Sequence, residues 1–442
     1  MQTTSLFQQF RQTVYQTVTK RADALLDFVD ALTVAGHVSS PVALSEEKPF
    51  RRKFSSIYDV IGKARWKESE LQSILATSQP GDCETIAGYE VYATDTTPDE
   101  REEAETLEDR VNLKAQKNEP VRVGQKFSWM VRLVKQRTSW VAPLDVCRVK
   151  SESTDSKMAV EQVKLLEKQS SRPKVIVADS LYANQVFLAV FLLVQHIFAL
   201  VRVRSTTHLC EEPKSKPIGS RGAPCKHGPT FKLKSPSREP DRTETFHLGH
   251  QKIRLSAWHQ LHFRKLSKLV GLVLRVEFLK ADDTLRYQRP MWLFWTGPET
   301  VALQDLCRMY LWRFAIEHAF RFMKQHLGLN AHTLANNDEV QRWMWLCALA
   351  YWQLLLMSQH VEDLSPAWYP AKRDSENKVM LTPGQVQRGA ERFITRLGTP
   401  ADPPRPAGKG RGRVKGYQPT PRTRYKVVQK TQSAPQMASA PP

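Results

Sequence analysis

The stretch from Tyr310 to Lys324 constrains the fold of this chain more than any other part of it. Apolar side chains fill most of the stretch, while Tyr310, Arg313, Glu317 and Lys324 recur at helical spacing. At ~3.6 residues per turn, these four polar residues share one side of a helix. A helix that is apolar around most of its circumference is normally buried, so the polar stripe needs partners inside the protein. A purely structural alternative is an ion pair between Arg313 and Glu317, one turn apart.

Upstream of this helix, strand-like and helical segments alternate. The strand-like run from Tyr89 is expected to end at an Asp-Thr-Thr-Pro turn that begins with Asp95, and a short apolar run ends at Asp179. The other expected strands are 126–134, 139–144 and 197–203, and a helix is expected over 156–169. This order is typical of a mixed α/β fold. Side chains at the ends of two such strands can converge at one edge of a sheet, which makes Asp95 and Asp179 candidate site residues.

The remaining segments differ in composition and suggest several units. Residues 1–88 are expected to be helical, and their basic stretch from Lys48 to Lys67 is either a solvated helix face or a DNA-contacting surface. The segment 205–295 is basic at first and strand-like from Ile253 onwards, as in an insertion, and helices are expected over 298–328 and 338–360. The expected units are 1–88 (helical, DNA-binding), 89–204 (first part of the core), 205–295 (β-rich insertion domain), 296–365 (second part of the core) and 366–442 (basic, flexible tail).

The charge of the chain favours a nucleic-acid partner. There are 65 Lys and Arg against 45 Asp and Glu, a formal net charge of +20, and such an excess attracts polyanions. The tail from Pro403 contains no acidic residue, and its basic side chains could lie along phosphates. These are Arg405, Lys409, Arg411, Arg413, Lys415, Arg422, Arg424, Lys426 and Lys430.

Nothing in the sequence predicts a membrane protein. The apolar runs 186–194 and 343–357 are shorter than the ~20 residues that span a bilayer, and the N-terminus has no signal-peptide pattern. The six cysteines are scattered, which suits a reducing cytosol better than a disulfide framework. We therefore expect a cytoplasmic protein associated with the nucleoid.

The spacing Y-x2-R-x3-E-x6-K resembles the signature of the DDE transposases of bacterial insertion sequences, in group four and its relatives. Further segments resemble that family in the family's order, over roughly residues 89–360. They are Tyr92-Ala-Thr-Asp95-Thr-Thr-Pro98, Thr106 with Asp109-Arg110, Arg137-Thr-Ser-Trp140 with Pro143-Leu-Asp145, and Val177-Ala-Asp179-Ser-Leu-Tyr182. The acidic run 99–105 departs from the pattern close to the first position.

The resemblance implies a ribonuclease H-like core that is divided in the sequence into two parts by the insertion domain. It also implies that Asp95, Asp179 and Glu317 are the catalytic, metal-binding carboxylates. The implied cofactor is Mg²⁺, for which Mn²⁺ substitutes, because oxygen ligands suit such hard cations. The implied reactions are phosphodiester hydrolysis at the ends of the element and transesterification into target DNA. The implied partners are double-stranded DNA, at terminal inverted repeats and target, and a second copy of the chain that forms a homodimer on paired ends.

The resemblance also suggests which residues contact DNA. Tyr310, Arg313 and Lys324, with the neighbouring Arg321, would lie beside the cut, where Arg and Lys bind phosphate. Independently of the resemblance, Trp292 or Trp295 could stack on an unpaired base, as aromatic side chains can; the alternative is that both belong to the core.

Several alternatives stay open at this point. Asp99 is a rival to Asp95, although it ends no strand. The pairs His208-x-Cys210 and Cys225-x-His227 are spaced like metal ligands, but C-x-H is unusual among structural zinc sites and Lys226-His227-Gly228 resembles a family segment, so we expect no zinc there. The chain could instead be a catalytically inactive DNA-binding protein of transposase descent, or a nuclease without strand transfer. A structural RNA-binding protein would not need the carboxylates.

Overall fold

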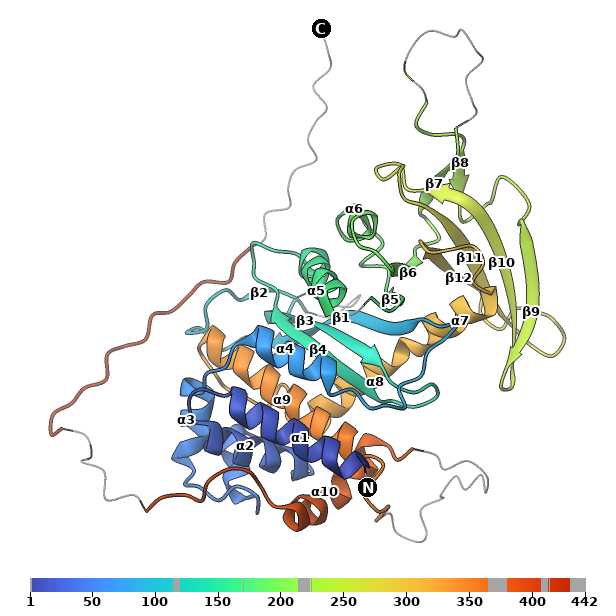
Figure 1. The fold of residues 1–442 in the computed structure, drawn as a ribbon. Helices are drawn as coiled ribbons and strands as arrows, with labels where there is room; N and C mark the ends of the chain where they lie inside the picture. Colours follow the sequence, from blue (N-terminus) through green and yellow to red (C-terminus); the bar gives the residue numbers. More distant parts are fainter. Residues whose placement is uncertain are drawn as a thin grey trace, which may run out of the picture.

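A computed structural model describes residues 2–113, 120–169, 171–213, 223, 225–364, 380–406, 412 and 414–429. It confirms a mixed α/β protein organised around one large sheet (Figure 1). Within the described ranges, no helix combines the length and the apolar character of a membrane span.

The centre of the sheet has the strand order β4-β3-β1-β5-β6. The strands are β1 (Glu90–Glu100), β3 (Val123–Leu133), β4 (Val141–Arg148), β5 (Lys174–Ala178) and β6 (Ile197–Val203). β3 runs antiparallel to both β1 and β4, whereas β1, β5 and β6 are parallel to one another. All of β5 is buried, as expected for a central parallel strand covered on both faces. This order is compatible with the expected ribonuclease H-like core.

The first strand is longer than the sequence predicted. We expected a turn after Asp95, but β1 continues through Pro98 to Glu100 and pairs with β3 along that whole length. On its other side β1 pairs with β5 only as far as Ala93. Pro98 lacks a backbone N–H to donate, and it is tolerated because that edge of the strand has already separated from β5.

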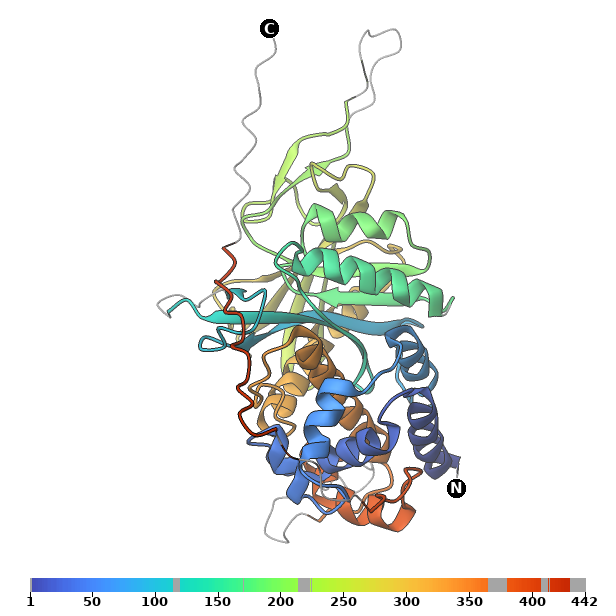
Figure 2. The same cartoon turned by 90° about the vertical axis from the view of Figure 1, so that its left-hand side faces the viewer.

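Helices cover both faces of this part of the sheet (Figure 2). On one face α5 (Asp155–Gln169) packs against β3 and against α6 (Gln185–Leu188), which the short helix η2 (Ala189–Leu192) follows. On the other face α8 (Phe314–Gln325) contacts β1, β3 and β4, beside α9 (Asn337–Met357) and α7 (Leu303–Trp312). The single helix expected over 298–328 was wrong in one respect: it is two helices, and Arg313 lies at the break between α7 and α8.

The insertion extends the core sheet. β12 pairs with β6, and the order continues β12-β11-β10-β7-β8, with β9 paired to β10, to give 12 strands in one sheet. The added strands are β7 (His208–Glu211), β8 (Thr230–Lys232), β9 (Arg242–Leu248), β10 (Gln251–His262), β11 (Val270–Leu279) and β12 (Met291–Trp295). The short strand β2 (Val111–Asn112) lies at the opposite edge, next to β3.

The N-terminal helices pack together with the end of the chain. They are α1 (Gln2–Thr17), α2 (Ala22–Val34), η1 (Pro41–Glu46), α3 (Ser55–Lys63) and α4 (Glu68–Thr77). α2 contacts both α9 and a C-terminal helix, α10 (Pro383–Leu397), which begins with a capping box at Thr382. The prediction of a flexible tail from residue 366 was therefore wrong for 383–397. The apolar residues Val386, Ala390, Phe393 and Ile394 recur on one face of α10 and are buried, as in any amphipathic helix.

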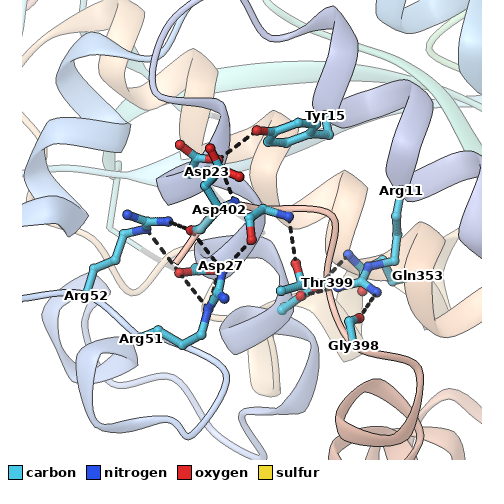
Figure 3. Close-up of polar contacts among 12 residues, drawn as sticks. Arg11, Tyr15, Asp23, Asp27, Arg51, Arg52, Gln353, Gly398, Thr399 and Asp402 are labelled. Carbon is cyan, nitrogen blue, oxygen red and sulfur yellow. Dashed lines mark hydrogen bonds and ion pairs between the residues drawn. The ribbon is translucent and has the colours of Figure 1, made fainter. Parts of the chain in front are cut away.

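Two arginines that form ion pairs with a buried aspartate of α2 also hydrogen-bond to the chain after α10 (Figure 3). Asp27 is paired with Arg51 at 2.7 Å and with Arg52 at 3.0 Å. The same two arginines donate to the backbone carbonyls of Ala401, at 3.1 Å, and Asp402, at 2.6 Å. In the basic stretch that begins at Lys48, these side chains therefore stabilise packing, which favours a structural role over DNA contact for both of them.

The described end of the tail lies along the β2 edge of the sheet. Tyr425 donates its N–H to the carbonyl of Glu105 at 2.7 Å, Val428 donates to Arg110 at 2.7 Å, and Val428 forms a parallel bridge with Val111. The expected phosphate contacts of this tail stay a prediction, and Lys409, Arg411, Arg413 and Lys430 lie outside the described residues.

Candidate active site

Asp95 and Asp179 occupy equivalent positions on neighbouring parallel strands. Ala93 of β1 is paired with Val177 of β5. Asp95 comes two residues after Ala93, and Asp179 comes two residues after Val177. Side chains two residues apart point to the same face of a sheet, and adjacent strands lie ~4.8 Å apart. The register therefore places both carboxylates side by side where β5 ends, although Asp95 itself lies inside β1 rather than at its end.

Glu317 approaches this edge of the sheet from helix α8, with the guanidinium of Arg313 between it and Asp95. Arg313, at the break before α8, joins the acids: its Nη1 lies 3.2 Å from Oδ2 of Asp95 and its Nη2 lies 2.5 Å from Oε1 of Glu317. The guanidinium is almost fully buried, whereas the Glu317 side chain is 45% exposed. The intrahelical pair expected from spacing is thus present, and the same arginine also extends it to Asp95.

Burial and neighbouring charge make Asp95 an unusual carboxyl. Burial raises its pKa to about 6; Arg313 opposes that rise, and Asp179 and Glu317 add to it. Oδ1 accepts the N–H of Thr96 at 2.8 Å. Coulomb repulsion from two further carboxylates at short range disfavours ionisation, so Asp95 gains most from a cation bound beside it.

The loop after β5 holds Asp179 through backbone hydrogen bonds. Oδ1 of Asp179 accepts the N–H of Leu181 at 2.8 Å, and its carbonyl accepts the N–H of Tyr182 at 3.2 Å. Asn184 then caps α6 by accepting the N–H of Phe187 at 3.2 Å and donates to the carbonyl of Leu181 at 2.7 Å. A rigid loop of this kind restricts the positions that the Asp179 carboxylate can take.

The structure separates the predicted DNA-contacting residues into buried and exposed ones. Tyr310 and Arg313 are buried, and the Arg313 guanidinium lies over the Tyr310 ring, 5.9 Å from its centroid. Arg321 is exposed on the same helix as Glu317. Lys324 is partly buried: burial lowers its pKa, and the acids Glu100 and Asp99, near the end of β1, raise it.

Trp295 lies in the core. It is fully buried in β12, and its indole N–H donates to the carbonyl of Pro298 at 3.0 Å. Trp292 is also buried. A tryptophan without an exposed ring face cannot stack on a base, so the expectation of base stacking at Trp295 is corrected to the core alternative.

Asp99 lies on the same face of β1 as Asp95 but has a different environment. It is 1% exposed, and the nearest basic group is Nε2 of His332 at 3.4 Å. Burial raises the pKa of Asp99 to about 7 and lowers that of His332 to about 3. The register thus places Asp95, and not its rival Asp99, next to Asp179.

Sequence reasoning did not single out a pocket beside the break between α7 and α8. Its volume is about 470 Å³, and its lining includes Arg137, Trp140, Trp312, Phe314 and His318. Phe314 is 46% exposed, although the sequence suggested a buried apolar residue. The available signal was the position of His318, directly after Glu317.

A family model matches a large part of the chain. The model of the family described as DDE superfamily endonuclease matches residues 6–265, a range that contains the N-terminal helices, Asp95 and Asp179 and ends before Glu317. Comparison with curated proteins gives no significant match. Because the family model spans more than half of the 442 residues, the chain belongs to the DDE superfamily endonucleases.

Proposed function

We propose that this chain is a DNA transposase that cuts the ends of an insertion sequence and joins them to target DNA, with Asp95, Asp179 and Glu317 as its catalytic carboxylates. The observation that carries the proposal is the register of β1 and β5, which places Asp95 beside Asp179, together with Arg313, which joins Asp95 to Glu317. Membership in the family identifies the chain as a nuclease- or transposase-type enzyme that acts on DNA.

DDE-type endonucleases generally use divalent metals, and the donor set here fits such ions. The three acids offer only oxygen ligands, which Mg²⁺ and Mn²⁺ prefer. Burial and the neighbouring Asp179 and Glu317 raise the pKa of Asp95 in spite of Arg313, so a divalent cation beside it would stabilise the ionised carboxylate. We propose Mg²⁺ as the ion, held by Asp95, Asp179 and Glu317; when bound, it would activate the attacking oxygen and stabilise the leaving one.

The protein's own side chains supply binding and orientation. Arg321, His318 and Phe314 are exposed on the side of α8 that carries Glu317, so a DNA backbone that approaches Glu317 also reaches Arg321. Arg313 is almost fully buried and paired with Asp95 and Glu317, so its contact with a phosphate, through the paired hydrogen bonds that a guanidinium can form, requires it to exchange one of these partners. Tyr310 packs under Arg313 and fixes its direction.

Cleavage and joining require the same site twice. In the first reaction a water molecule attacks phosphorus at the end of the element and displaces the element's 3′-oxygen; in the second, this freed 3′-hydroxyl attacks a phosphorus of target DNA and displaces a 3′-oxygen of the target strand. Both ends of an element must be processed together, so we propose a homodimer on paired terminal inverted repeats, in the cytoplasm with the nucleoid. Two alternatives differ from this proposal in what they require. A nuclease that only hydrolyses DNA would need no target DNA, and an inactive DNA-binding descendant would need no carboxylates.

Excision from a plasmid tests the proposal. The DNA that flanks the native gene is placed around a marker, and the protein is supplied in trans as the intact chain, Glu317→Gln or Glu161→Gln. Glu161 is a matched control, because it is an exposed helical glutamate on α5 at the other face of the sheet. We expect excision and reinsertion with the intact chain and with Glu161→Gln, and neither with Glu317→Gln.

The other outcomes separate the alternatives. Excision that survives Glu317→Gln would contradict the site. Cleaved ends without reinsertion, again dependent on Glu317, would indicate a nuclease. Binding to the flanking DNA without cleavage by the intact chain would indicate an inactive DNA-binding descendant.

A further inference from the structure

A second group of potential metal ligands lies in the inserted strands, beyond β6 and away from the carboxylates. Cys210 near the end of β7 and His262 at the end of β10 are direct cross-strand partners. Their side chains meet that of His227, which precedes β8. One ligand atom from each residue lies within 4.8 Å of the other two, and this is the only such His, Cys, Asp or Glu group in the described part of the chain.

The backbone holds His227 at this place. The N–H of Gly228 donates to the carbonyl of Glu211 at 2.9 Å, and the N–H of Glu211 donates to the carbonyl of Pro229 at 3.0 Å. A Cβ at Gly228 would lie 2.1 Å from the carbonyl oxygen of Glu212, so only glycine allows this close approach. The position of His227 therefore follows from two hydrogen bonds and one obligatory glycine.

The separations match a metal site. Nδ1 of His227 lies 3.0 Å from Nε2 of His262, with the two rings nearly parallel. In a tetrahedral zinc site with Zn–N of ~2.05 Å, two ligand nitrogens lie about 3.3 Å apart. A hydrogen bond between the two imidazoles would also account for 3.0 Å, but it would give no role to Cys210, which is buried beside them.

We propose that Cys210, His227 and His262 bind one zinc ion. Thiolate and imidazole ligands suit Zn²⁺ and not Mg²⁺, so this site would not compete with the carboxylates for the same ion. The ion fastens the segment before β8 to the ends of β7 and β10 and thereby stabilises the outer part of the sheet. The proposal departs from the expectation of no zinc at His208-x-Cys210 and Cys225-x-His227: it uses one residue of each pair, and the third ligand, His262, is distant from both pairs in sequence.

Metal binding by the purified full chain tests the proposal. The protein is stripped with a chelator, and Zn²⁺ is then titrated with elemental analysis of the metal retained. Co²⁺ is added in a parallel sample as a spectroscopic probe, because a thiolate ligand gives a charge-transfer absorption that carboxylates do not. The variants are Cys210→Ser and His262→Gln, and His208→Ala is the matched control, two residues from Cys210 on the same strand but outside the group.

We expect one tightly held Zn²⁺ per chain and a thiolate-to-cobalt band, both retained in His208→Ala. Loss of a direct ligand should weaken Zn²⁺ binding by at least ~100-fold, since even outer partners of metal ligands cost 10–100-fold. The proposal is overturned if Co²⁺ gives no thiolate band with the intact chain, or if the band survives Cys210→Ser. The spectrum of the intact chain decides the question even if both variants misfold. Because neither readout depends on DNA cleavage, the result is independent of the transposase proposal.

Discussion

Two parts of the same sheet hold two different donor groups by the same device. At β1 and β5, parallel strands in register place Asp95 beside Asp179. At β7 and β10, antiparallel strands in register place Cys210 beside His262. In each case a third residue arrives from elsewhere in the sequence, Glu317 on a helix and His227 in a loop.

The two groups differ in charge, exposure and the segments around them. The carboxylate group borders an exposed helix face that includes Arg321, and its excess of negative charge is only partly offset by Arg313. The Cys-His group contains no carboxylate and lies among strands that continue the core. The comparison suggests that charge left uncompensated next to an exposed surface marks the site of chemistry, whereas closely packed donors without a carboxylate mark a site of stabilisation.

The largest expected effect comes from Asp179→Asn, which removes a negative charge from the carboxylate group at nearly constant shape. Loss of metal-assisted charge stabilisation should reduce DNA cleavage by roughly 10³-fold or more, while zinc stoichiometry stays unchanged. Cleavage of labelled element ends and elemental analysis measure the two quantities on one preparation. A joint loss of cleavage and zinc would show that the two groups are not separate.

Asp99→Asn tests whether a buried acid on the same strand face as Asp95 serves packing alone. Because its folded-state pKa is raised to about 7, wild-type Asp99 keeps its proton when folded while the unfolded chain loses it, so this residue reduces stability as pH rises from about 4 to about 7. The free energy of unfolding of the variant, relative to that of wild type, should therefore be higher at pH 8 than at pH 5 by on the order of 2 kcal/mol.

Urea unfolding of both proteins at the two pH values measures this difference. A pH-independent difference between them would contradict the protonation of folded Asp99. Cleavage activity should persist in the variant, and its complete loss would return Asp99 to the list of site residues.

A smaller effect concerns the pH dependence of divalent binding at the carboxylates. Asp95 has a pKa of about 6 in the metal-free protein, so protons compete with the cation below that pH. Mn²⁺ affinity should fall about tenfold per pH unit below this pKa and level off above it. Calorimetric titration from pH 5 to pH 8, with Asp95→Asn as the control that lacks this titration, measures the profile; a flat profile in wild type would contradict the assignment.

The smallest expected effect comes from Asn184→Ala in the loop that holds Asp179. Loss of the cap of α6 should destabilise the protein by about 1 kcal/mol and reduce cleavage less than Asp179→Asn does. Thermal unfolding and the cleavage assay together report it. An equal loss of activity in the two variants would mean that Asn184 acts on the reaction itself.

Much of the core was predictable because short buried strands have strong local signals. The strand 174–178 and the strand 197–203 appear as expected, since short apolar runs rich in β-branched residues favour a buried strand over a helix. The failures have equally local causes. Pro98 suggested a turn because proline has no N–H to donate to a neighbouring strand. It is accommodated in β1 because the pairing of β1 with β5 ends at Ala93, which leaves that edge of β1 unpaired at Pro98.

The helix at 383–397 has local signals, a capping box at Thr382 and an amphipathic pattern, which the expectation of a flexible tail overlooked. What covers its apolar face, and what buries Trp295, depends on contacts between segments far apart in sequence, α10 with α2 and β12 with β6. An amphipathic pattern shows which face of a helix is apolar, but it does not show what covers that face.

By itself the sequence determined the mixed α/β class and the positive charge, because strand patterns and composition are local properties, and its resemblance to a known family pointed to three candidate carboxylates. Only the tertiary structure decided that Asp95 rather than Asp99 lies next to Asp179, that Arg313 links two of the acids, and that His262 joins Cys210 and His227. Strand register and helix packing bring distant residues together, and no local pattern in the chain carries that information.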